Sequence, residues 1–424
     1  MIAAHTTHAG VGRQGTQGRA HPSWVASWAA MPQLTEPGNM PPAPFTQPGQ
    51  VLADTTLRQT VHTSIDGRVL RLRISNAFGG APLPITKVAV ALPAGGAAGV
   101  SAIQPGSSRS VTFSGRPSTV IPTGALMVSD PVALAVSAQA NVTVTLYLAA
   151  GQASNDITSH PGSRTTSYLL RGDATAANDL PGATPVDHWY FLSGLEVLAT
   201  PRASGVAALG DSLTDGRGST TNGNDRWPDQ LLARLQADRS TRDVAVINEA
   251  AGGNRVLNDG LGPNALARFD RDVIAQSGVD SVIVFEGVND IGTADATPTA
   301  QQAVADELIG AYEQFVLRAH AEGIRVYGAT ITPFGANTPY DDAQGLRQQT
   351  REAVNEWIRS SRRFDAVLDF DRAVRDPQDP ERILPAYDVG DHLHLNPAGY
   401  GALAAAVPNR LLSPDRSSTD WRLP

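Results

Sequence analysis

The sequence of 424 residues contains no cysteine. That absence excludes disulfides, thiolate zinc sites, iron–sulfur clusters and a cysteine nucleophile together. No uninterrupted apolar stretch is long enough to span a bilayer as a helix. Runs of lysine and arginine are missing too, and the formal net charge is −8. Because a basic face is what binds nucleic acid or an anionic membrane surface, the composition argues against both partners.

Length and composition indicate a globular protein of two or three domains. The chain is longer than a typical domain, and its hydrophobic fraction of 41% is ordinary for a folded protein. Residues 1–22 are rich in glycine, histidine, threonine and glutamine and lack the apolar segment of a signal peptide. We therefore expect a flexible leader there, and a C-terminal tail over residues 416–424.

Residues 23–200 carry the patterns of a β-rich domain. Leucine and isoleucine alternate with arginine over residues 69–75, and apolar residues alternate with threonine and tyrosine over residues 141–148. An alternation of period two is typical of a half-buried strand. Clusters of glycine, proline and aspartate between such segments indicate turns. The sequence therefore predicts an all-β domain, a sandwich or jelly-roll-like fold, over residues 23–200.

Residues 201–415 show a different pattern, in which short apolar runs alternate with helical segments. Five runs are predicted to be buried parallel strands: residues 206–209, 244–247, 281–285, 326–331 and 366–370. The clearest helix follows Thr297, a good N-cap, has Pro298 at its first position and ends before Gly323. Strict alternation of strand and helix predicts an α/β fold, a three-layer α/β/α sandwich with a mostly parallel, flavodoxin-like sheet.

The first of these strands runs directly into the turn Gly210-Asp211-Ser212-Leu213. Ligands of parallel sheets bind beyond the carboxyl ends of the strands, so Ser212 is a candidate nucleophile. The alternative is a turn in which Asp211 or Ser212 merely caps the next helix. The G-x-S-x-G elbow of α/β-hydrolases is absent, since Thr214 occupies its last position.

Two further turns follow predicted strands. Gly252 and Gly253 lie in the turn after residues 244–247, where glycine allows backbone N–H groups to face a site. Asn289 lies after residues 281–285, and an uncharged amide at that place is a good oxyanion donor. The alternatives are an ordinary βα loop for the glycines and a turn-forming asparagine or helix cap for Asn289.

A fourth element lies near the C-terminus, where Asp391, His392 and His394 follow one another closely. An aspartate and a histidine three residues apart in a loop can both face one serine, and the carboxylate can stabilise the charged imidazole. Two alternatives stay open at this point. The three residues could instead bind a metal, or the histidines could have only a structural role.

The four elements, taken in this order, resemble the SGNH/GDSL hydrolase family over about residues 203–412. Ser212, Gly253, Asn289 and His394 stand at the four positions that give the family its name. The resemblance implies a serine esterase of that family's α/β/α fold, working without a cofactor or a metal.

The resemblance also implies a role for each residue. Ser212 attacks the ester carbonyl, His394 acts as the general base, and Asp391 orients His394. The oxyanion is held by the N–H groups of Ser212 and Gly253 and by the amide of Asn289, with Gly252 as a rival for the position of Gly253. His392 is a neighbour without a role in proton transfer. Four more residues are implied to fix the loops of the site: Asp211, Asn254, Arg255 and Asp290.

Residues 24–30, 58–59 and 72–79 resemble the β-rich N-terminal module of two-domain bacterial GDSL esterases, some of which are grouped with xylan-associated acetylesterases. This implies short-acyl or acetyl esters, including acetylated carbohydrates, as substrates, and export to the periplasm or beyond. The alternatives are a broad aryl esterase, lipase or lysophospholipase of the same family. Outside the family they are a metal-dependent hydrolase and a non-catalytic carbohydrate-binding protein.

Overall fold

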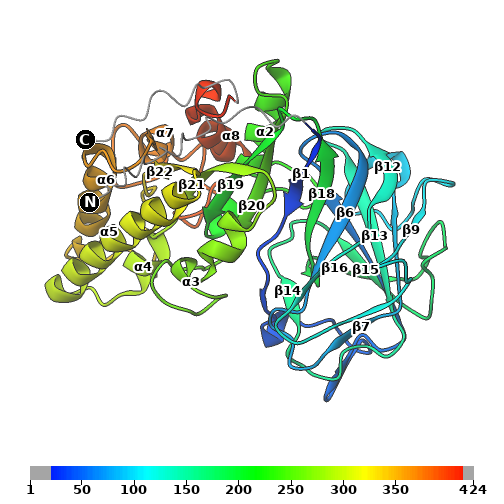
Figure 1. Ribbon diagram of the computed structural model, residues 1–424. Helices are drawn as coiled ribbons and strands as arrows, with labels where there is room; N and C mark the ends of the chain where they lie inside the picture. Colours follow the sequence, from blue (N-terminus) through cyan, green and yellow to red (C-terminus); the bar gives the residue numbers. More distant parts are fainter. Residues whose placement is uncertain (1–20, 414–424) are drawn as a thin grey trace, which may run out of the picture.

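The computed structural model describes residues 21–413, and it has two halves that lie side by side (Figure 1). The predicted leader, apart from His21 and Pro22, and the predicted tail over residues 416–424 lie outside the described residues. Antiparallel sheets make up the N-terminal half, and a parallel sheet with helices makes up the C-terminal half. The predicted change of fold class along the chain is therefore confirmed.

Two larger sheets form the N-terminal half. The first has the order β1-β18-β6-β11, with β12 also paired to β6, and the second has the order β16-β15-β5-β13-β8-β9. The strands of the first are β1 (Ser23–Ala29), β6 (Gly67–Ser75), β11 (Leu126–Val128), β12 (Val132–Val136) and β18 (Leu192–Ala199). Those of the second are β5 (Thr55–His62), β8 (Lys87–Ala91), β9 (Arg109–Val111), β13 (Asn141–Leu148), β15 (Ser167–Arg171) and β16 (Thr184–Val186). Apolar side chains of both sheets share one hydrophobic core.

Shorter strands complete the N-terminal half. They are β2 (Gln33–Leu34), β14 (Thr158–His160) and β17 (Trp189–Tyr190) in one sheet, β7 (Leu83–Ile85) and β10 (Thr119–Ile121) in a second, and β3 (Thr46–Gln47) and β4 (Gln50–Val51) in a third. Of these, β14 matters most for the site, because it ends at His160 beside the C-terminal half.

The predicted alternation of buried and exposed residues holds for β6 but not for β13. Along β6 the leucines and the isoleucine are buried, whereas Arg71 and Arg73 are half-buried, as a period of two requires. Along β13 the threonines at positions 143 and 145 are buried as well, so the prediction of a half-buried strand is wrong. The reason is that loops cover the second face of β13. The side chain of Arg58 lies over that face and donates to Thr145 and to the carbonyls of Ser101 and Ala177.

All five predicted strands of the C-terminal half are present in one parallel sheet of order β20-β19-β21-β22-β23. They are β19 (Ser204–Gly210), β20 (Val244–Ala250), β21 (Val279–Phe285), β22 (Arg325–Ala329) and β23 (Ala366–Leu368). The apolar residues of these strands are buried in one core with the helices, which explains why each strand reads as a continuous apolar run.

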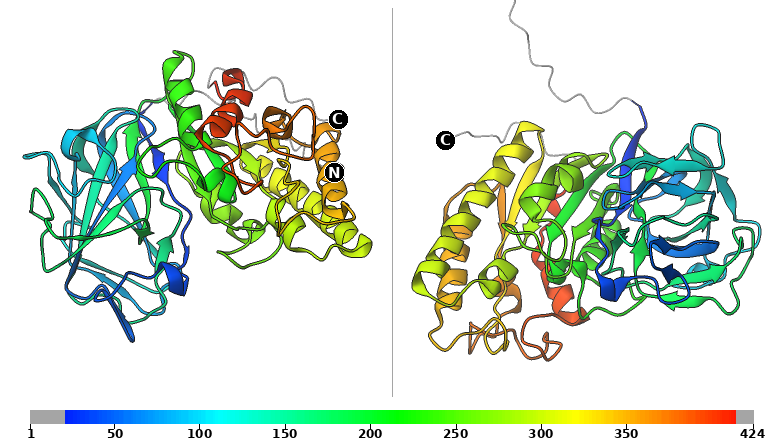
Figure 2. Two further views of the ribbon diagram at one scale, coloured as in Figure 1. Left: turned by 180° about the vertical axis from the view of Figure 1, so that it is seen from behind. Right: turned by 90° about the horizontal axis from the view of Figure 1, so that it is seen from below.

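Helices pack around the sheet in two groups (Figure 2). One group contains α2 (Trp227–Ala237), α7 (Phe370–Val374) and α8 (Pro397–Ala406). The other contains α3 (Ala265–Phe269), α4 (Val288–Thr293), α5 (Pro298–Ala321) and α6 (Leu346–Ser360). In α5 the predicted N-cap Thr297 accepts a hydrogen bond from the N–H of Ala300, and Gly323 follows the last turn with φ +74°. No helix of residues 21–413 is long and apolar enough to cross a membrane.

The two halves are in direct contact. The chain passes from β18 to β19 through residues 200–203 only, and β1 packs against β20 at the edge of the parallel sheet (Figure 1). Ser64 donates its hydroxyl proton to the carbonyl of Val246 at 2.6 Å. The N–H of Ala26 donates to the carbonyl of Ser277 at 2.8 Å. These contacts join the N-terminal half to β20 and to the segment just before β21.

Candidate active site

The turn after β19 places Ser212 at the carboxyl edge of the sheet. Asp211 caps the short helix α1 (Ser212–Asp215) by accepting a hydrogen bond from the N–H of Leu213 at 2.9 Å. A Cβ atom at Gly210 would lie 2.4 Å from the hydroxyl of Thr214, so only glycine fits before the cap. As the first residue of α1, Ser212 has an N–H group without a partner inside the helix.

Ser212, His394 and Asp391 form a continuous chain of hydrogen bonds. The Oγ of Ser212 lies 2.8 Å from Nε2 of His394, and Nδ1 of His394 lies 2.7 Å from Oδ2 of Asp391. Oδ1 of Asp391 accepts from the backbone N–H of His394 at 2.8 Å, which holds the two residues in one turn. Because the carboxylate can only accept, Nδ1 carries a proton and Nε2 is left to accept from the serine.

The pKa values of Asp391 and His394 suit a general base at His394. Burial would raise the pKa of Asp391, but hydrogen bonds from the backbone and ring of His394 outweigh it and lower that pKa below its ordinary value. Burial lowers the pKa of His394, against the opposing effect of Asp391. The imidazole is therefore neutral at neutral pH and able to take a proton from the serine hydroxyl.

Asn289 and the glycine turn lie on the same edge of the sheet. Nδ2 of Asn289 donates to the carbonyl of Asn254 at 2.7 Å, and Oδ1 accepts from the hydroxyl of Tyr340 at 2.6 Å. Gly252 uses its N–H to bind Oδ2 of Asp215 at 3.1 Å. The N–H of Gly253 has no acceptor among residues 21–413 and remains available. The geometry thus favours Gly253 over its rival Gly252.

The loop over residues 256–263 is fixed by side chains that the sequence singled out. Asp290 accepts from two of its backbone N–H groups, at 2.9 and 3.0 Å. Asn254 donates to two of its carbonyl groups, at 3.1 and 2.9 Å. Arg255 donates to a third carbonyl of the same loop. Asp290 thus links this loop, which follows β20, to α4, which follows β21.

Sequence reasoning missed Arg268, which lies beneath the site. Its side chain is fully buried and donates to the carbonyl groups that end β19 and β20, and to Oδ1 of Asn254 at 3.0 Å. It also pairs with Asp272 at 3.3 Å and Glu286 at 3.5 Å. An arginine on a short helix gives no sign in the sequence that it will be buried, so this role depends on the packing of α3.

Three carboxyl groups near the site are buried. Burial raises the pKa of Asp211 to about 7, that of Glu286 to about 8 and that of Asp290 to about 6. The main cause is the loss of hydration, which disfavours the charged form.

Both halves line the cleft above Ser212, which has a volume of about 480 Å³. The C-terminal half contributes Ser212, His394 and Asn289, together with Tyr340. The N-terminal half contributes mainly polar and charged groups: Gln33, Glu36, Asn39, His160, Arg164, Asp187 and His188. All seven of these were missed by sequence reasoning, because their segments lie far from the motifs in the chain.

The alternative of a metal site has no support in the geometry. Among residues 21–413 no group of three or more histidine, cysteine, aspartate or glutamate residues is arranged to hold a metal ion. His392 binds Asp388 through Nδ1 at 2.7 Å, whereas His394 binds Asp391. The two histidines therefore have separate carboxylate partners.

The C-terminal half of the chain is similar to known proteins. The profile of the GDSL-like lipase/acylhydrolase family matches residues 208–402, whereas no curated protein matches the chain. Among solved structures, a catalytic mutant of an acetylxylan esterase from Geobacillus stearothermophilus is similar with a TM-score of 0.37 and 21% identity, over 48% of this chain and 93% of that one. A GDSL-like lipase from Bacteroides thetaiotaomicron has a TM-score of 0.33 and 18% identity, over 48% and 85% of the chains. The C-terminal half of the chain is thus a GDSL-like lipase/acylhydrolase domain, preceded by a β-rich N-terminal half.

Proposed function

We propose that the protein is a serine esterase that hydrolyses carboxylic esters through an acyl-enzyme. The observation that carries this proposal is the hydrogen-bonded chain of Ser212, His394 and Asp391 in the cleft. Ser212 Oγ attacks the ester carbonyl while Nε2 of His394 takes its proton. His394 then gives the proton to the departing alcohol, which leaves an acyl group on Ser212. Water, activated by His394, hydrolyses that acyl-enzyme and restores the serine.

The negative charge on the carbonyl oxygen is held by three donors in this mechanism. They are the N–H groups of Ser212 and Gly253 and the second proton of the Asn289 amide. The first amide proton is already bound to the carbonyl of Asn254. Donors that are fixed before the reaction stabilise the oxyanion without reorganisation in the transition state.

We further propose short-acyl or acetyl esters of polar alcohols, including acetylated carbohydrates, as the substrates. Most of the residues that line the cleft are polar or charged, and its aliphatic side chains are few, mainly those of Leu261 and Leu393. A long acyl chain needs an apolar channel to replace its contacts with water, whereas a sugar hydroxyl needs hydrogen-bonding partners. This composition therefore favours a carbohydrate esterase over a lipase or lysophospholipase.

A panel of esters tests the proposal on the wild type and on Ser212→Ala. We expect the wild type to hydrolyse acetyl esters and acetylated xylo-oligosaccharides faster than octanoyl esters, and Ser212→Ala to be inactive on all of them with an unchanged unfolding temperature. An organophosphate should label Ser212 and inactivate the enzyme irreversibly. Near-normal turnover by Ser212→Ala would disprove the assignment of the nucleophile, and a preference for octanoyl esters would disprove the substrate class.

A further inference from the structure

A buried ion pair joins the two halves directly beneath the cleft. Nε2 of His160, at the end of β14, lies 2.9 Å from Oδ1 of Asp215, the last residue of α1. The two side chains are only 4% and 1% exposed. A Cβ atom at Gly162 would lie 1.8 Å from the same carboxylate, so this close approach of the halves requires glycine.

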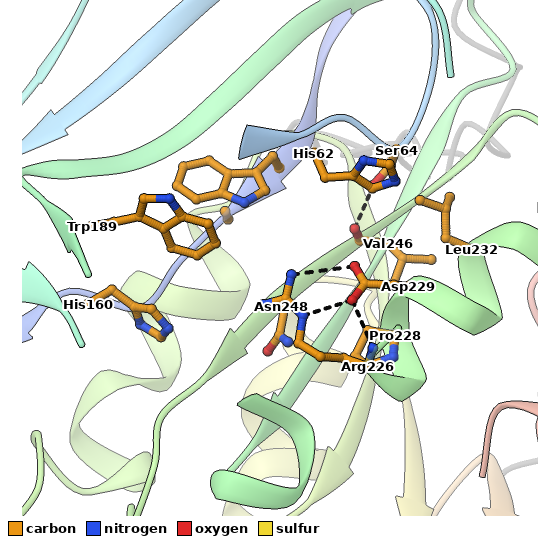
Figure 3. A pocket seen from close by; sticks show the side chains of 12 residues that line it. His62, Ser64, His160, Trp189, Arg226, Pro228, Asp229, Leu232, Val246 and Asn248 are labelled. Carbon is orange, nitrogen blue, oxygen red and sulfur yellow. Dashed lines mark hydrogen bonds and ion pairs between the residues drawn. The ribbon is translucent and has the colours of Figure 1, made fainter. Parts of the chain in front are cut away.

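Both ring nitrogens of His160 are held by hydrogen bonds. Nδ1 lies 3.0 Å from the carbonyl of Met31, and Nε2 lies 2.9 Å from the carboxylate of Asp215. Trp189 stacks on the ring with the centroids 5.7 Å apart. Figure 3 shows the two rings beside each other, with Asn248 and Arg226 across the small cavity between the halves.

Asp215 connects His160 to the glycine turn. Its Oδ2 accepts from the N–H of Gly252 at 3.1 Å, and the next residue, Gly253, is a proposed oxyanion donor. Asp215 also lies only three residues after Ser212, in the same short helix. One carboxylate therefore ties the helix of the nucleophile to the turn that faces the oxyanion.

We propose that His160 is a positioning residue, through which the N-terminal half holds Asp215 and so aims the N–H of Gly253 into the cleft. This inference rests on the proposed function. His160 matters because it fixes the direction of the carboxylate. Without it, the buried Asp215 would lose the side-chain partner of Oδ1 and keep only the N–H of Gly252 on Oδ2.

The test uses His160→Leu, Asp215→Ala and the double variant in the full chain. Each single variant should lower kcat on a short acetyl ester about tenfold to a hundredfold, with KM changed by less than about threefold, because oxyanion stabilisation acts on the transition state. The kcat of the double variant should be no lower than that of the slower single variant, because each substitution removes the same contact between His160 and Asp215. His62→Leu is the matched control. His62 lies at the same interface and is bonded to Asn224 and Asn141, so its loss should leave kcat unchanged.

Three results would overturn the inference. The first is a kcat within twofold of wild type in both single variants. The second is a double variant in which the two reductions in kcat multiply, and the third is an equal reduction in kcat in His62→Leu. If a single variant does not fold, Gly162→Ala replaces it, because its added methyl group displaces the Asp215 carboxylate. It should lower kcat in the same way, and a normal kcat would count against the inference. A failure of the proposed function itself would be seen separately, as a wild type that neither hydrolyses esters nor reacts with an organophosphate.

A second inference comes from two arginines of the cleft. Arg164 and Arg217 line it together with Ser212 and His394, and neither forms an ion pair within residues 21–413. The Nε atom of Arg164 is buried and has no hydrogen-bond partner there. Arg164 also has φ +50°, a conformation that is uncommon for a residue with a side chain. The N-terminal half thus holds a guanidinium at the site at some conformational cost.

Within residues 21–413, the carboxylates that line the cleft form no ion pair with these two arginines. Glu36 accepts from Gln33 and Asn39, and Asp215 is bound to His160. Asp187 accepts from the hydroxyl of Thr166.

The two arginines affect the pKa of His394. Burial is the main cause of the lowered pKa of His394, and the positive charges of Arg217 and Arg164 lower it further. Both arginines thus lie near the imidazole in the same cleft.

We infer that Arg164 and Arg217 form a subsite for a carboxylate carried by the substrate, so that the preferred esters are acetylated acidic alcohols such as uronic acid units. This deepens the proposed function and rests on it. Guanidinium groups bind carboxylates in two-point geometry, and a negative substrate group would also satisfy the unpartnered Nε of Arg164.

Two small esters of equal shape test this subsite. The acetyl ester of glycolate carries a negative charge, and the acetyl ester of glycolamide is its neutral analogue. We expect wild type kcat/KM to favour the charged ester about tenfold, as a partly exposed charge-assisted bond allows. Arg164→Gln and Arg217→Gln should each reduce that ratio towards one. Arg109→Gln should keep it, because Arg109 is exposed and bonded only within its own turn.

A ratio of one in the wild type, or a ratio unchanged in both cleft variants, would overturn the subsite. Turnover of the neutral ester by the wild type reports on the proposed function alone, so the two ideas can fail independently. If Arg109→Gln also reduced the ratio of kcat/KM for the charged ester to that for the neutral ester, the preference would come from the net charge of the whole molecule. That result would also overturn the inference of a subsite.

Discussion

The hydroxyl of Tyr340 lies 2.6 Å from Oδ1 of Asn289. Because Nδ2 of the same amide donates to the carbonyl of Asn254, the two contacts fix which end of the amide is oxygen and which is nitrogen. One N–H of Asn289 is then left for the cleft. Tyr340 therefore orients a proposed oxyanion donor from a loop 51 residues further along the chain.

Asn289→Ala should lower kcat about a hundredfold to a thousandfold with a smaller effect on KM, as expected for a lost oxyanion donor. Steady-state kinetics on a soluble acetyl ester measure this. The binding of a phosphonate transition-state analogue should weaken in parallel with kcat. Equal weakening of substrate and analogue binding would instead indicate a purely structural asparagine.

Tyr340→Phe should lower kcat about tenfold while leaving KM nearly unchanged, since it removes one hydrogen bond that orients the amide. Tyr147→Phe is a matched control, because the hydroxyl of Tyr147 donates to Asp54 far from the cleft. The control should keep the wild type kcat. If Tyr340→Phe also keeps it, Asn289 does not need this contact.

The pH dependence of the rate should report the titration of His394. Activity requires the neutral imidazole, and burial lowers its pKa below the ordinary 6.5, so the acidic limb of kcat/KM should lie below that pH. Asp391 opposes that shift by stabilising the imidazolium. Asp391→Asn should therefore move the limb to lower pH and also reduce kcat. A limb that moves to higher pH would contradict this assignment.

His392→Ala separates the serine mechanism from a metal mechanism. We expect this variant to keep most of its activity, because His392 is bonded to Asp388 and not to Asp391 or Ser212. His394→Ala should be nearly inactive, and chelators should have no effect on the wild type. Inactivation by a chelator with rescue by zinc would contradict the proposed roles of Ser212 and His394.

Arg268→Met should destabilise the fold by about 3–5 kcal/mol, because it leaves buried carboxyl groups and strand-end carbonyls without their donor. Urea unfolding gives the free energy of unfolding for both proteins. Arg318→Met is the control, since Arg318 pairs with the exposed Asp270 and such surface pairs contribute about 0–1 kcal/mol. Similar losses in the two variants would show that Arg268 has no special role.

Glu286 should make the protein less stable as the pH rises. Burial raises its pKa in the folded state to about 8, above the ordinary 4.5. Its contribution to stability is therefore complete below about pH 4.5 and is lost as the pH rises through about 8. In Glu286→Gln the free energy of unfolding should fall less over this range than in the wild type. An identical pH dependence in the two proteins would show that Glu286 does not titrate there.

The sequence by itself determined the five parallel strands, the long helix α5 and the order of the four candidate elements. Each of these depends on local patterns: an apolar run for a buried strand, Thr297 and Pro298 for a helix start, and a glycine turn at a strand end. Asp391 and His394 could be paired in advance because they lie three residues apart in one loop. The same local patterns place Ser212 and Asn289 at the edge where strands of a parallel sheet end.

Only the tertiary structure decided which groups support the site. The N–H of Gly252 is bound to Asp215, which in turn contacts His160 of the other half, and neither contact can be read from the sequence. Tyr340 and Arg268 reach the site from separate segments, and nothing near them in the sequence marks them. Contacts between distant segments follow from how the halves and helices pack, and a pattern that repeats every two or four residues carries no information about that packing.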